Sequence, residues 1–230
     1  MSLQNKTAYS AVYAPMHLIG LVPAEAQSLL DVGAGPGGVG KVMRNRGFTG
    51  RIVAIEPVAD RIAPNAEFYN EIHTCHIENY QTEQRFDVIM LADVLEHLHD
   101  PWQALKSLRH LLSPTGLLLV QVPNVMHPDF LLNFVCGDAQ YVSAGICDIT
   151  HIRWFNRLSI IRSIQEAGYT MKIFSRVYKN DQERATANQP VSGQLMKLAN
   201  PQTGRELLIP AVDLADYLTF QYIVSAENGG

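Results

Sequence analysis

A glycine-rich turn follows the first strongly apolar run of the sequence and carries its most specific chemistry. Asp31 stands near the end of that run, and glycines occupy positions 33, 35, 37, 38 and 40. Glycine has no Cβ, so such a turn can adopt positive φ and let a ligand lie against bare peptide. A second carboxylate, Glu56, follows the next apolar run, at the place where an acid binds ribose hydroxyls. The pattern predicts a nucleoside-containing cofactor.

Two cofactors fit this arrangement, NAD and S-adenosylmethionine. Gly33, Gly35 and Gly38 match the G-x-G-x-x-G spacing, which on its own is a weak signal for either. Asp31 favours S-adenosylmethionine, because its carboxylate would attract the ammonium group of the methionine part and repel a pyrophosphate. The run from Asp93 to Leu98, directly after another apolar segment, also favours it. An NAD-dependent oxidoreductase stays as the alternative.

Strand and helix patterns alternate from residue 28 onward, which predicts an α/β fold with a mainly parallel sheet and helices on both faces. Proline and glycine positions set the predicted ends of the helices. On the last two helices, we expect Trp102 and Leu105, and then Leu158, Ile161 and Ile164, to face the core. The predicted strands cover 28–32, 51–55, 71–76, 86–91, 117–122, 169–178 and 218–226, and the predicted helices cover 38–46, 59–66, 101–112 and 156–167.

The chain of 230 residues suits one domain, 1–230, with two additions. Residues 6–21 are rich in tyrosine and apolar side chains, so we expect residues 1–22 to form a helical cap over the sheet edge. Residues 179–216 are polar and interrupted by prolines, and we interpret them as an insertion or lid before the last strand. The last strand is expected to pair antiparallel with the strand at 169–178.

Composition narrows the class of partners. The formal net charge is −4 and there is no run of Lys or Arg, which argues against binding nucleic acid through a basic surface. Three cysteines without a CxxC pair indicate reduced thiols. No apolar stretch is long enough to span a membrane, and no signal peptide is evident, so we expect a cytoplasmic protein. The sequence does not indicate the oligomeric state.

Several segments, in order, resemble the successive motifs of class I S-adenosylmethionine-dependent methyltransferases. Two later segments resemble one branch, the methyltransferase-23 type, which is related to the ubiquinone-biosynthesis O-methyltransferases. The resemblance covers roughly residues 29–174. The first segments are Leu30-Asp31-Val32-Gly33-Ala34-Gly35, Ile55-Glu56-Pro57, Phe86-Asp87-Val88-Ile89 and Asp93-Val94-Leu95-Glu96-His97-Leu98; the later ones are Pro123-Asn124-Val125-Met126-His127 and Asp148-Ile149-Thr150-His151-Ile152-Arg153-Trp154-Phe155.

This resemblance implies a Rossmann-like sheet of seven strands in the order 3-2-1-4-5-7-6, with strand 7 antiparallel. It also implies S-adenosyl-L-methionine as cofactor, with Gly33 and Gly35 facing its methionine part and Glu56 binding its ribose. Where the family often has Gly-Asp after the third strand, this chain has Cys75-His76, so the adenine contact would fall to Ile77 and Glu78. The full predicted cofactor set is Asp31, Gly33, Ala34, Gly35, Gly38, Glu56, Pro57, Ile77, Glu78 and Asp93, with Asp93 alternatively capping the short helix that contains Glu96.

Histidines are the candidate acid–base residues. A hydroxyl acceptor needs a base near neutral pH, so we favour O-methylation with His151 as first candidate, His127 as second and His97 as third. The acceptor is expected to be a small molecule or a glycan- or lipid-linked group. We predict no metal, because His97, His99 and Asp100 lack further ligands at a defined spacing. A non-catalytic protein that binds S-adenosylmethionine is the other alternative.

Overall fold

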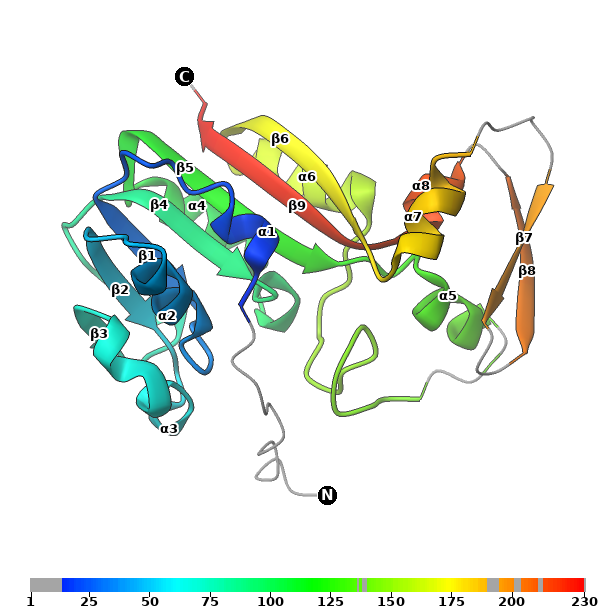
Figure 1. The fold of residues 1–230 in the computed structure, drawn as a ribbon, viewed down its shortest axis with the longest axis horizontal. Coiled ribbons are helices and arrows are strands. Elements are labelled where there is room, and N and C mark those ends of the chain that lie inside the picture. The colour runs from blue at the N-terminus through cyan, green and yellow to red at the C-terminus, as the bar shows by residue number, and fades with distance from the viewer. Residues whose placement is uncertain are drawn as a thin grey trace.

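A seven-stranded sheet carries the fold, with strand order β3-β2-β1-β4-β5-β9-β6 (Figure 1). The computed structural model describes residues 14–135, 137, 140–189, 195–200, 204–210 and 213–229. β9 pairs antiparallel with both β5 and β6, and the pairs among the first five strands are parallel. With β9 as the seventh strand of this sheet, the predicted order and its one antiparallel strand are confirmed. The strands are β1 (Ser28–Val32), β2 (Arg51–Ile55), β3 (Glu71–His73), β4 (Phe86–Ala92), β5 (Leu112–Pro123), β6 (Tyr169–Tyr178) and β9 (Thr219–Asn228).

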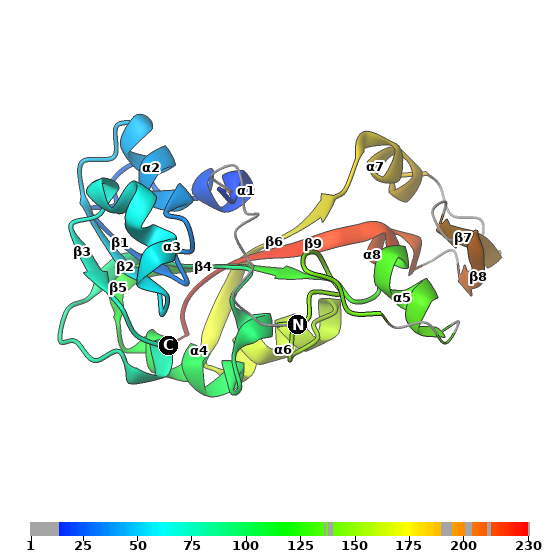
Figure 2. The same cartoon turned by 90° about the horizontal axis from the view of Figure 1, so that it is seen from below.

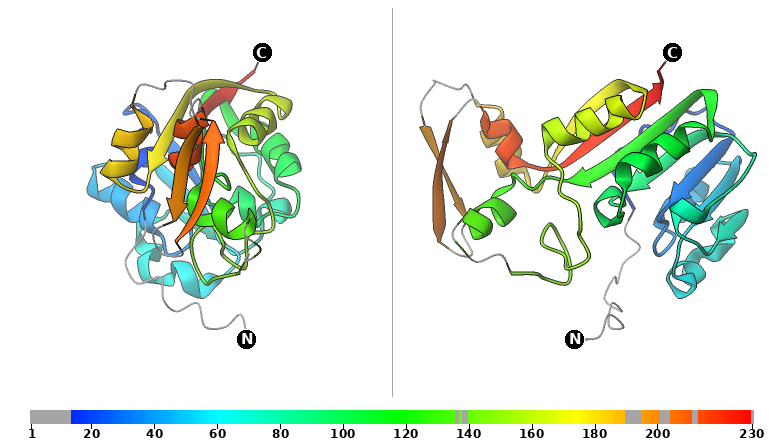
Figure 3. Two further views of the ribbon diagram at one scale, coloured as in Figure 1. Left: turned by 90° about the vertical axis from the view of Figure 1, so that its right-hand side faces the viewer. Right: turned by 180° about the vertical axis from the view of Figure 1, so that it is seen from behind.

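Helices cover both faces of this sheet (Figure 2). Successive strand residues point to opposite faces, so β1 sends Leu29 to one core and Leu30 to the other. The face of Leu29 is covered by α1 (Met16–Ile19), α2 (Gly38–Asn45) and α3 (Ala59–Ile62). The face of Leu30 is covered by α4 (Pro101–Arg109) and α6 (Arg157–Glu166), which lie in front of the sheet when it is seen from behind (Figure 3). Three short 3-10 helices complete this part: η2 (Ala63–Phe68), η3 (Ile77–Asn79) and η4 (Leu95–His97).

Helices formed where the sequence predicts them, but on two of them the predicted buried face is wrong in part. Asp100 caps α4 by accepting a hydrogen bond from the Gln103 amide at 2.9 Å. Trp102, predicted to lie in the core, is 43% exposed, because its indole lies across the contact between α4 and α6 and donates to Ser163 Oγ at 3.0 Å. On α6, Leu158 is 59% exposed, and Ile160 and Ile164 are the buried residues. The helix register thus differs from the prediction by a partial turn.

Three predicted elements end earlier than expected. The helix predicted over 101–112 ends at Arg109, and Leu112 instead begins β5, five residues before the predicted strand. β3 stops at His73, whereas the prediction ran to residue 76. The helix after β2 stops at Ile62 and continues as η2, which is kinked at Asn65 (φ −131°, ψ 23°) one residue after Pro64. Much of the predicted N-terminal cap, residues 1–13, lies outside the described residues, and the described part contains α1.

A second group of elements extends from the far ends of β6 and β9, and we call it the outer lobe (Figure 1). It comprises α5 (Pro128–Val135), α7 (Asp181–Ala187), the hairpin of β7 (Leu195–Asn200) and β8 (Arg205–Pro210), and α8 (Leu214–Leu218). Its small core contains Leu198, Ile209, Leu214 and Leu218. No helix among the described residues has the length and apolar character needed to cross a membrane.

Candidate active site

The glycine turn between β1 and α2 has the conformation that glycine favours. Gly33, Gly35 and Gly37 have φ values of 68°, 53° and 79°. A Cβ on Gly33 would lie 2.7 Å from Val94 Cγ2, and one on Gly37 would lie 2.8 Å from Asn65 Cβ, so both positions are packed. A Cβ on Gly35 would meet nothing closer than 3.9 Å. The turn is therefore packed on its protein side and leaves bare backbone open at Gly35.

Glu56 holds this turn against the end of β2. Its side chain is 2% exposed; one carboxylate oxygen accepts from the Gly35 amide at 2.9 Å and the other from the Val58 amide at 3.0 Å. The Ile55 carbonyl accepts from the amides of Gly33 and Ala34. A carboxylate fixed by backbone donors beside an open glycine turn is well placed for hydroxyl groups of a ligand. Ribose binding by Glu56 stays a prediction.

Asp31 is buried below the turn, where it binds Tyr69. Its carboxylate accepts from the Tyr69 hydroxyl at 2.7 Å, and that hydroxyl oxygen accepts from the Gly40 amide at 3.0 Å. Burial, with a smaller effect from the charge of Glu56, raises the pKa of Asp31 to about 7. Asp31 thus links β1 to the first turn of α2 through Tyr69, and its predicted contact with a ligand ammonium group stays a prediction.

Sequence reasoning missed Tyr69. The sequence contains one indirect signal, the glycine at position 40. The structure explains it, because a Cβ there would lie 2.5 Å from the Tyr69 ring. Nothing in the residues around position 69 marks the tyrosine itself as a site residue.

The remaining predicted cofactor residues lie around this turn without defining a contact. Gly38 is buried in the first turn of α2. Ile77 is half-buried and packs on the core, whereas Pro57 and Glu78 are exposed. Their contacts with a cofactor stay predictions.

Asp93 follows β4 in a strained conformation. Among the described residues that are not glycine, it is the one with positive φ, at 54°. Its carboxylate oxygens accept from the side-chain amides of Gln121 at 3.0 Å and Gln221 at 2.8 Å, which come from β5 and β9. Such strain persists where the surroundings enforce it and clusters at functional sites. Because Asp93 directly follows β4, it lies at the carboxyl edge of the sheet, where open α/β folds bind ligands.

Glu96, His97 and His151 come together next to this edge, and we call them the histidine cluster. One potential ligand atom from each residue lies within 4.8 Å of the others. The two imidazole rings meet edge to face, with centroids 4.7 Å apart. Glu96 is 1% exposed and neither carboxylate oxygen has a hydrogen-bond partner. Burial, followed by the charge of Asp93, raises the pKa of Glu96 well above its usual range.

A loop far along the chain completes this cluster. Ile152 and Arg153 both donate their amides to the Glu96 carbonyl, at 2.9 and 3.0 Å. His97 Nδ1 lies 3.1 Å from the Thr150 carbonyl oxygen. These contacts place His151 over η4. Val94, two residues before Glu96, is the residue packed on Gly33, so the cluster adjoins the glycine turn.

His127, the other predicted catalytic histidine, has different surroundings. It is 1% exposed, its Nδ1 accepts from the Asp129 amide at 3.2 Å, and its Nε2 lies 3.5 Å from Glu183 of α7. Its ring meets Phe220 edge to face. Burial lowers its pKa. The structure therefore joins two of the three predicted histidines and places the third between α5, α7 and β9; its catalytic role stays a prediction.

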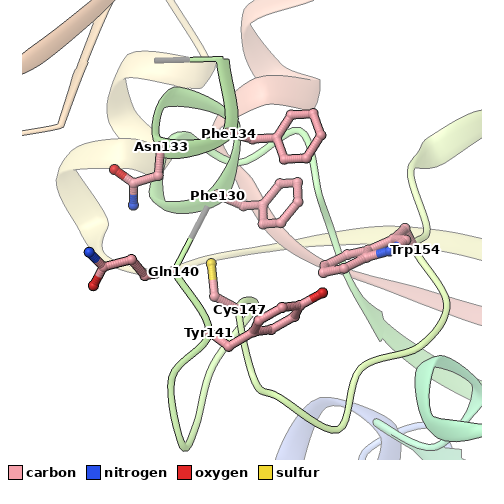
Figure 4. A pocket seen from close by; sticks show the side chains of 7 residues that line it. All are labelled: Phe130, Asn133, Phe134, Gln140, Tyr141, Cys147 and Trp154. Atoms are coloured by element: carbon pink, nitrogen blue, oxygen red, sulfur yellow. The ribbon is translucent and has the colours of Figure 1, made fainter. Parts of the chain in front are cut away.

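An aromatic pocket lies on the same loop (Figure 4). Phe130 stacks on Phe134 with centroids 5.6 Å apart, and its ring is 4.7 Å from that of Trp154. Cys147 and Trp154 line the pocket from positions on either side of His151. The lining residues are Phe130, Asn133, Phe134, Gln140, Tyr141, Cys147 and Trp154, none of which carries a positive charge.

Sequence and fold comparisons define the class of this protein. A family model described as a methyltransferase domain matches residues 8–172. Because the match covers more than half of the chain, the chain belongs to this family, and its fold and motifs are those of the class I S-adenosylmethionine-dependent methyltransferases. S-adenosylmethionine is the methyl donor of this class.

Several relatives carry one name. A protein named trans-aconitate 2-methyltransferase from Escherichia coli (strain 55989 / EAEC) is 28% identical over 172 residues, covering 71% of this chain and 65% of its own length. A protein of the same name from Escherichia coli O17:K52:H18 is 32% identical over 171 residues, with the same coverage. The match thus spans just under two thirds of these relatives.

Solved structures share the fold at low sequence identity. A SAM-dependent methyltransferase from Archaeoglobus fulgidus has a TM-score of 0.56 at 14% identity, covering 89% of this chain and 87% of that one. The 4+2 cyclase SpnF has a TM-score of 0.55 at 16% identity, covering 88% and 75%. Because a cyclase has the same fold, the fold alone does not decide the reaction.

Proposed function

We propose that this protein transfers the methyl group of S-adenosylmethionine to an oxygen atom of an acceptor with an apolar or aromatic body. One observation carries the proposal: the open glycine turn and the histidine cluster adjoin through the contact of Gly33 with Val94. A cofactor site and a set of proton-accepting side chains therefore share one edge of the sheet. The family match favours S-adenosylmethionine over NAD.

The residues of the turn fit this cofactor. Gly35 leaves backbone open to an approaching ligand, and the Glu56 carboxylate lies beside it. When bound, the cofactor supplies a methyl group on a positively charged sulfur; as the acceptor oxygen bonds to the methyl carbon, the carbon–sulfur bond breaks and its electron pair stays on sulfur. The protein's task is to align these atoms and exclude water.

The histidine cluster supports an oxygen acceptor. A hydroxyl must lose its proton in the reaction, and imidazole is a suitable base near neutral pH. His151 Nδ1 lies 2.9 Å from the Ile146 carbonyl oxygen. That oxygen accepts a hydrogen bond from the Nδ1–H, so Nε2 is the basic nitrogen of the ring. We assign removal of the acceptor proton to this cluster, with His151 as the first candidate.

The aromatic pocket supports a particular acceptor class. Its walls are flat rings without a cation, so they suit an apolar or aromatic group better than a tricarboxylate. The relatives named for trans-aconitate therefore support a small-molecule oxygen acceptor without fixing its identity. A glycan or lipid carrier attached to such a group is compatible with the exposed edge at Tyr141, which is 63% exposed.

Binding of the cofactor is tested first by calorimetry with S-adenosylmethionine and with NADH. We expect saturable binding of the former and none of the latter. Glu56→Gln should weaken S-adenosylmethionine binding about 10- to 100-fold, because the hydroxyl groups of the ligand would then donate to a neutral amide in place of a charged carboxylate. Glu67→Gln, an exposed carboxylate on η2, is the matched control. Unchanged affinity in Glu56→Gln would remove the ribose role, and preferential binding of NADH would overturn the cofactor assignment.

Turnover is tested by the release of S-adenosylhomocysteine with a panel of phenols, hydroxylated quinones and polycarboxylates. We expect product with hydroxylated aromatic compounds. Tight cofactor binding without product from any acceptor would instead favour the non-catalytic alternative.

A further inference from the structure

We propose that Glu96, His97 and His151 bind a divalent first-row transition-metal ion. The three residues supply one carboxylate and two imidazoles, a donor set common in catalytic metal sites that keep a position open for substrate. Their candidate ligand atoms lie within 4.8 Å of one another. Bonds of about 2.0–2.2 Å would bring them somewhat closer, which side-chain rotations can supply.

The orientation of the histidines supports ligation. Metal-bound histidines usually donate the proton of the other ring nitrogen to a carbonyl or carboxylate, and this fixes which nitrogen binds the metal. Here His97 Nδ1 lies 3.1 Å from the Thr150 carbonyl oxygen, and His151 Nδ1 lies 2.9 Å from that of Ile146. Both rings therefore keep Nε2 as the nitrogen with a lone pair.

Glu96 provides an independent observation. Its carboxylate is almost completely buried, and within the part of the chain that the structure describes neither oxygen has a hydrogen-bond partner. Leaving such a group unsatisfied costs free energy, and a buried carboxylate normally pairs with a donor or coordinates a metal. Asp93 and Asp148 lie close enough to add negative potential at this position. A cation among these residues would satisfy Glu96 and offset the surrounding charge.

The donor chemistry selects the kind of ion. Two imidazole nitrogens favour Zn²⁺ or Co²⁺ over Mg²⁺ and Ca²⁺, which prefer oxygen ligands. The role of the ion rests on the proposed function and changes one step of it. With Nε2 of His151 bound to the ion, that nitrogen is no longer the base; the ion would hold the acceptor oxygen next to the glycine turn and lower the pKa of the acceptor hydroxyl, whose proton would leave to water. In this arrangement His97 and His151 would both bind the ion, and neither would act as a free base.

The test uses the full chain without an affinity tag, treated with a chelator and then titrated with Co²⁺ while visible absorption is recorded. We expect one Co²⁺ per chain with ligand-field bands of a histidine-coordinated ion, displacement by one equivalent of Zn²⁺, and no displacement by equimolar Mg²⁺. Glu96→Gln and His151→Ala should each weaken Co²⁺ binding at least tenfold. His99→Ala, with an exposed side chain outside the cluster, is the matched control and should bind as the wild type does.

Folding of each variant is checked by circular dichroism and thermal unfolding, and His151→Ala, a half-buried loop residue, keeps the test decisive if Glu96→Gln does not fold. Absence of saturable Co²⁺ binding, or binding unchanged in both cluster variants, would overturn the proposal. The titration contains no S-adenosylmethionine and no acceptor. Metal binding without cofactor binding would therefore defeat the proposed function alone, and cofactor binding without metal binding would defeat this inference alone.

Discussion

The glycine turn and the histidine cluster share one edge of the sheet but are held by different means. The turn is fixed by groups from neighbouring elements: Glu56 binds Gly35, and Asp31 reaches Gly40 through Tyr69. The cluster depends on a loop more than fifty residues away in sequence, which the Glu96 carbonyl and His97 bind. The glycine turn, the candidate cofactor half, is thus held by neighbouring strands and helices, whereas the histidine cluster, the candidate acceptor half, depends on a distant loop, and loops vary more freely.

The two halves also differ in how their buried carboxylates are satisfied. Asp31 has a short hydrogen bond from Tyr69, and Glu56 accepts from two backbone amides. Glu96 is equally buried, but its carboxylate has no hydrogen-bond partner among the residues that the structure describes. The carboxylates around the glycine turn thus each have a donor within the protein, while the histidine cluster has a carboxylate that a ligand would satisfy. We expect substitutions in the first to change stability and substitutions in the second to change turnover.

The largest expected effect is on stability and concerns Asp31. Its pKa in the folded protein, about 7, lies above its ordinary value of 3.8, so between these pH values the folded protein retains a proton there that the unfolded chain loses. The free energy of unfolding should therefore fall as pH rises from about 4 to 7, by about 4 kcal/mol from this group. Asp31→Asn, which keeps an acceptor for Tyr69, should lack this loss and be more stable than the wild type at pH 8.

Urea denaturation at pH 5 and pH 8 measures this difference. The groups facing Asp31 are the Tyr69 hydroxyl and the Glu56 carboxylate, and neither is changed in the variant. Asp60→Asn, in the exposed first turn of α3, is the control and should follow the wild type at both pH values. Parallel pH dependence of Asp31→Asn and wild type would show that Asp31 is charged in the folded protein.

An intermediate effect is expected on turnover at the cluster. His151→Ala should lower turnover about 100-fold, a typical loss for a group that removes a proton or holds the acceptor, and leave affinity for S-adenosylmethionine nearly unchanged. Initial rates and calorimetry on the same preparation separate the two. His99→Ala should keep both parameters. Equal turnover in His151→Ala and wild type would remove His151 from the reaction and restore His127 as a candidate.

The smallest expected effect is in the outer lobe. Asp216 accepts from Arg157 Nε at 2.6 Å and Arg176 Nη2 at 2.8 Å, joining α8 to α6 and β6. These groups are partly exposed, so Asp216→Asn should cost no more than about 1 kcal/mol of unfolding free energy and leave turnover unchanged. Thermal unfolding and initial rates measure both. A marked loss of turnover with intact stability would support the predicted lid role of residues 179–216, which is not otherwise tested.

Periodicity and turn chemistry predicted the sheet well because these signals are local. The helices predicted to begin at residues 38, 101 and 156 begin in the structure at Gly38, Pro101 and Arg157. The face of α6 was misjudged, since Leu158 and Ile160 are both apolar and only the neighbouring helix decides which is buried. Trp102 was misjudged for the same reason. Its exposure depends on how α4 packs against α6, and neither segment alone predicts that contact.

The sequence by itself determined the positions of most strands, the glycine turn and the family, because each depends on residue types at short, fixed spacings; the strand order followed from the family resemblance. The tertiary structure alone decided that Tyr69 binds Asp31, that the Glu96 carboxylate is buried without a hydrogen-bond partner among the described residues, and that His151 reaches His97 while His127 does not. The contacts of Asp31 with Tyr69 and of His97 with His151 join residues 38 and 54 positions apart, and their geometry follows from how the strands and loops pack. No short sequence pattern predicts that packing.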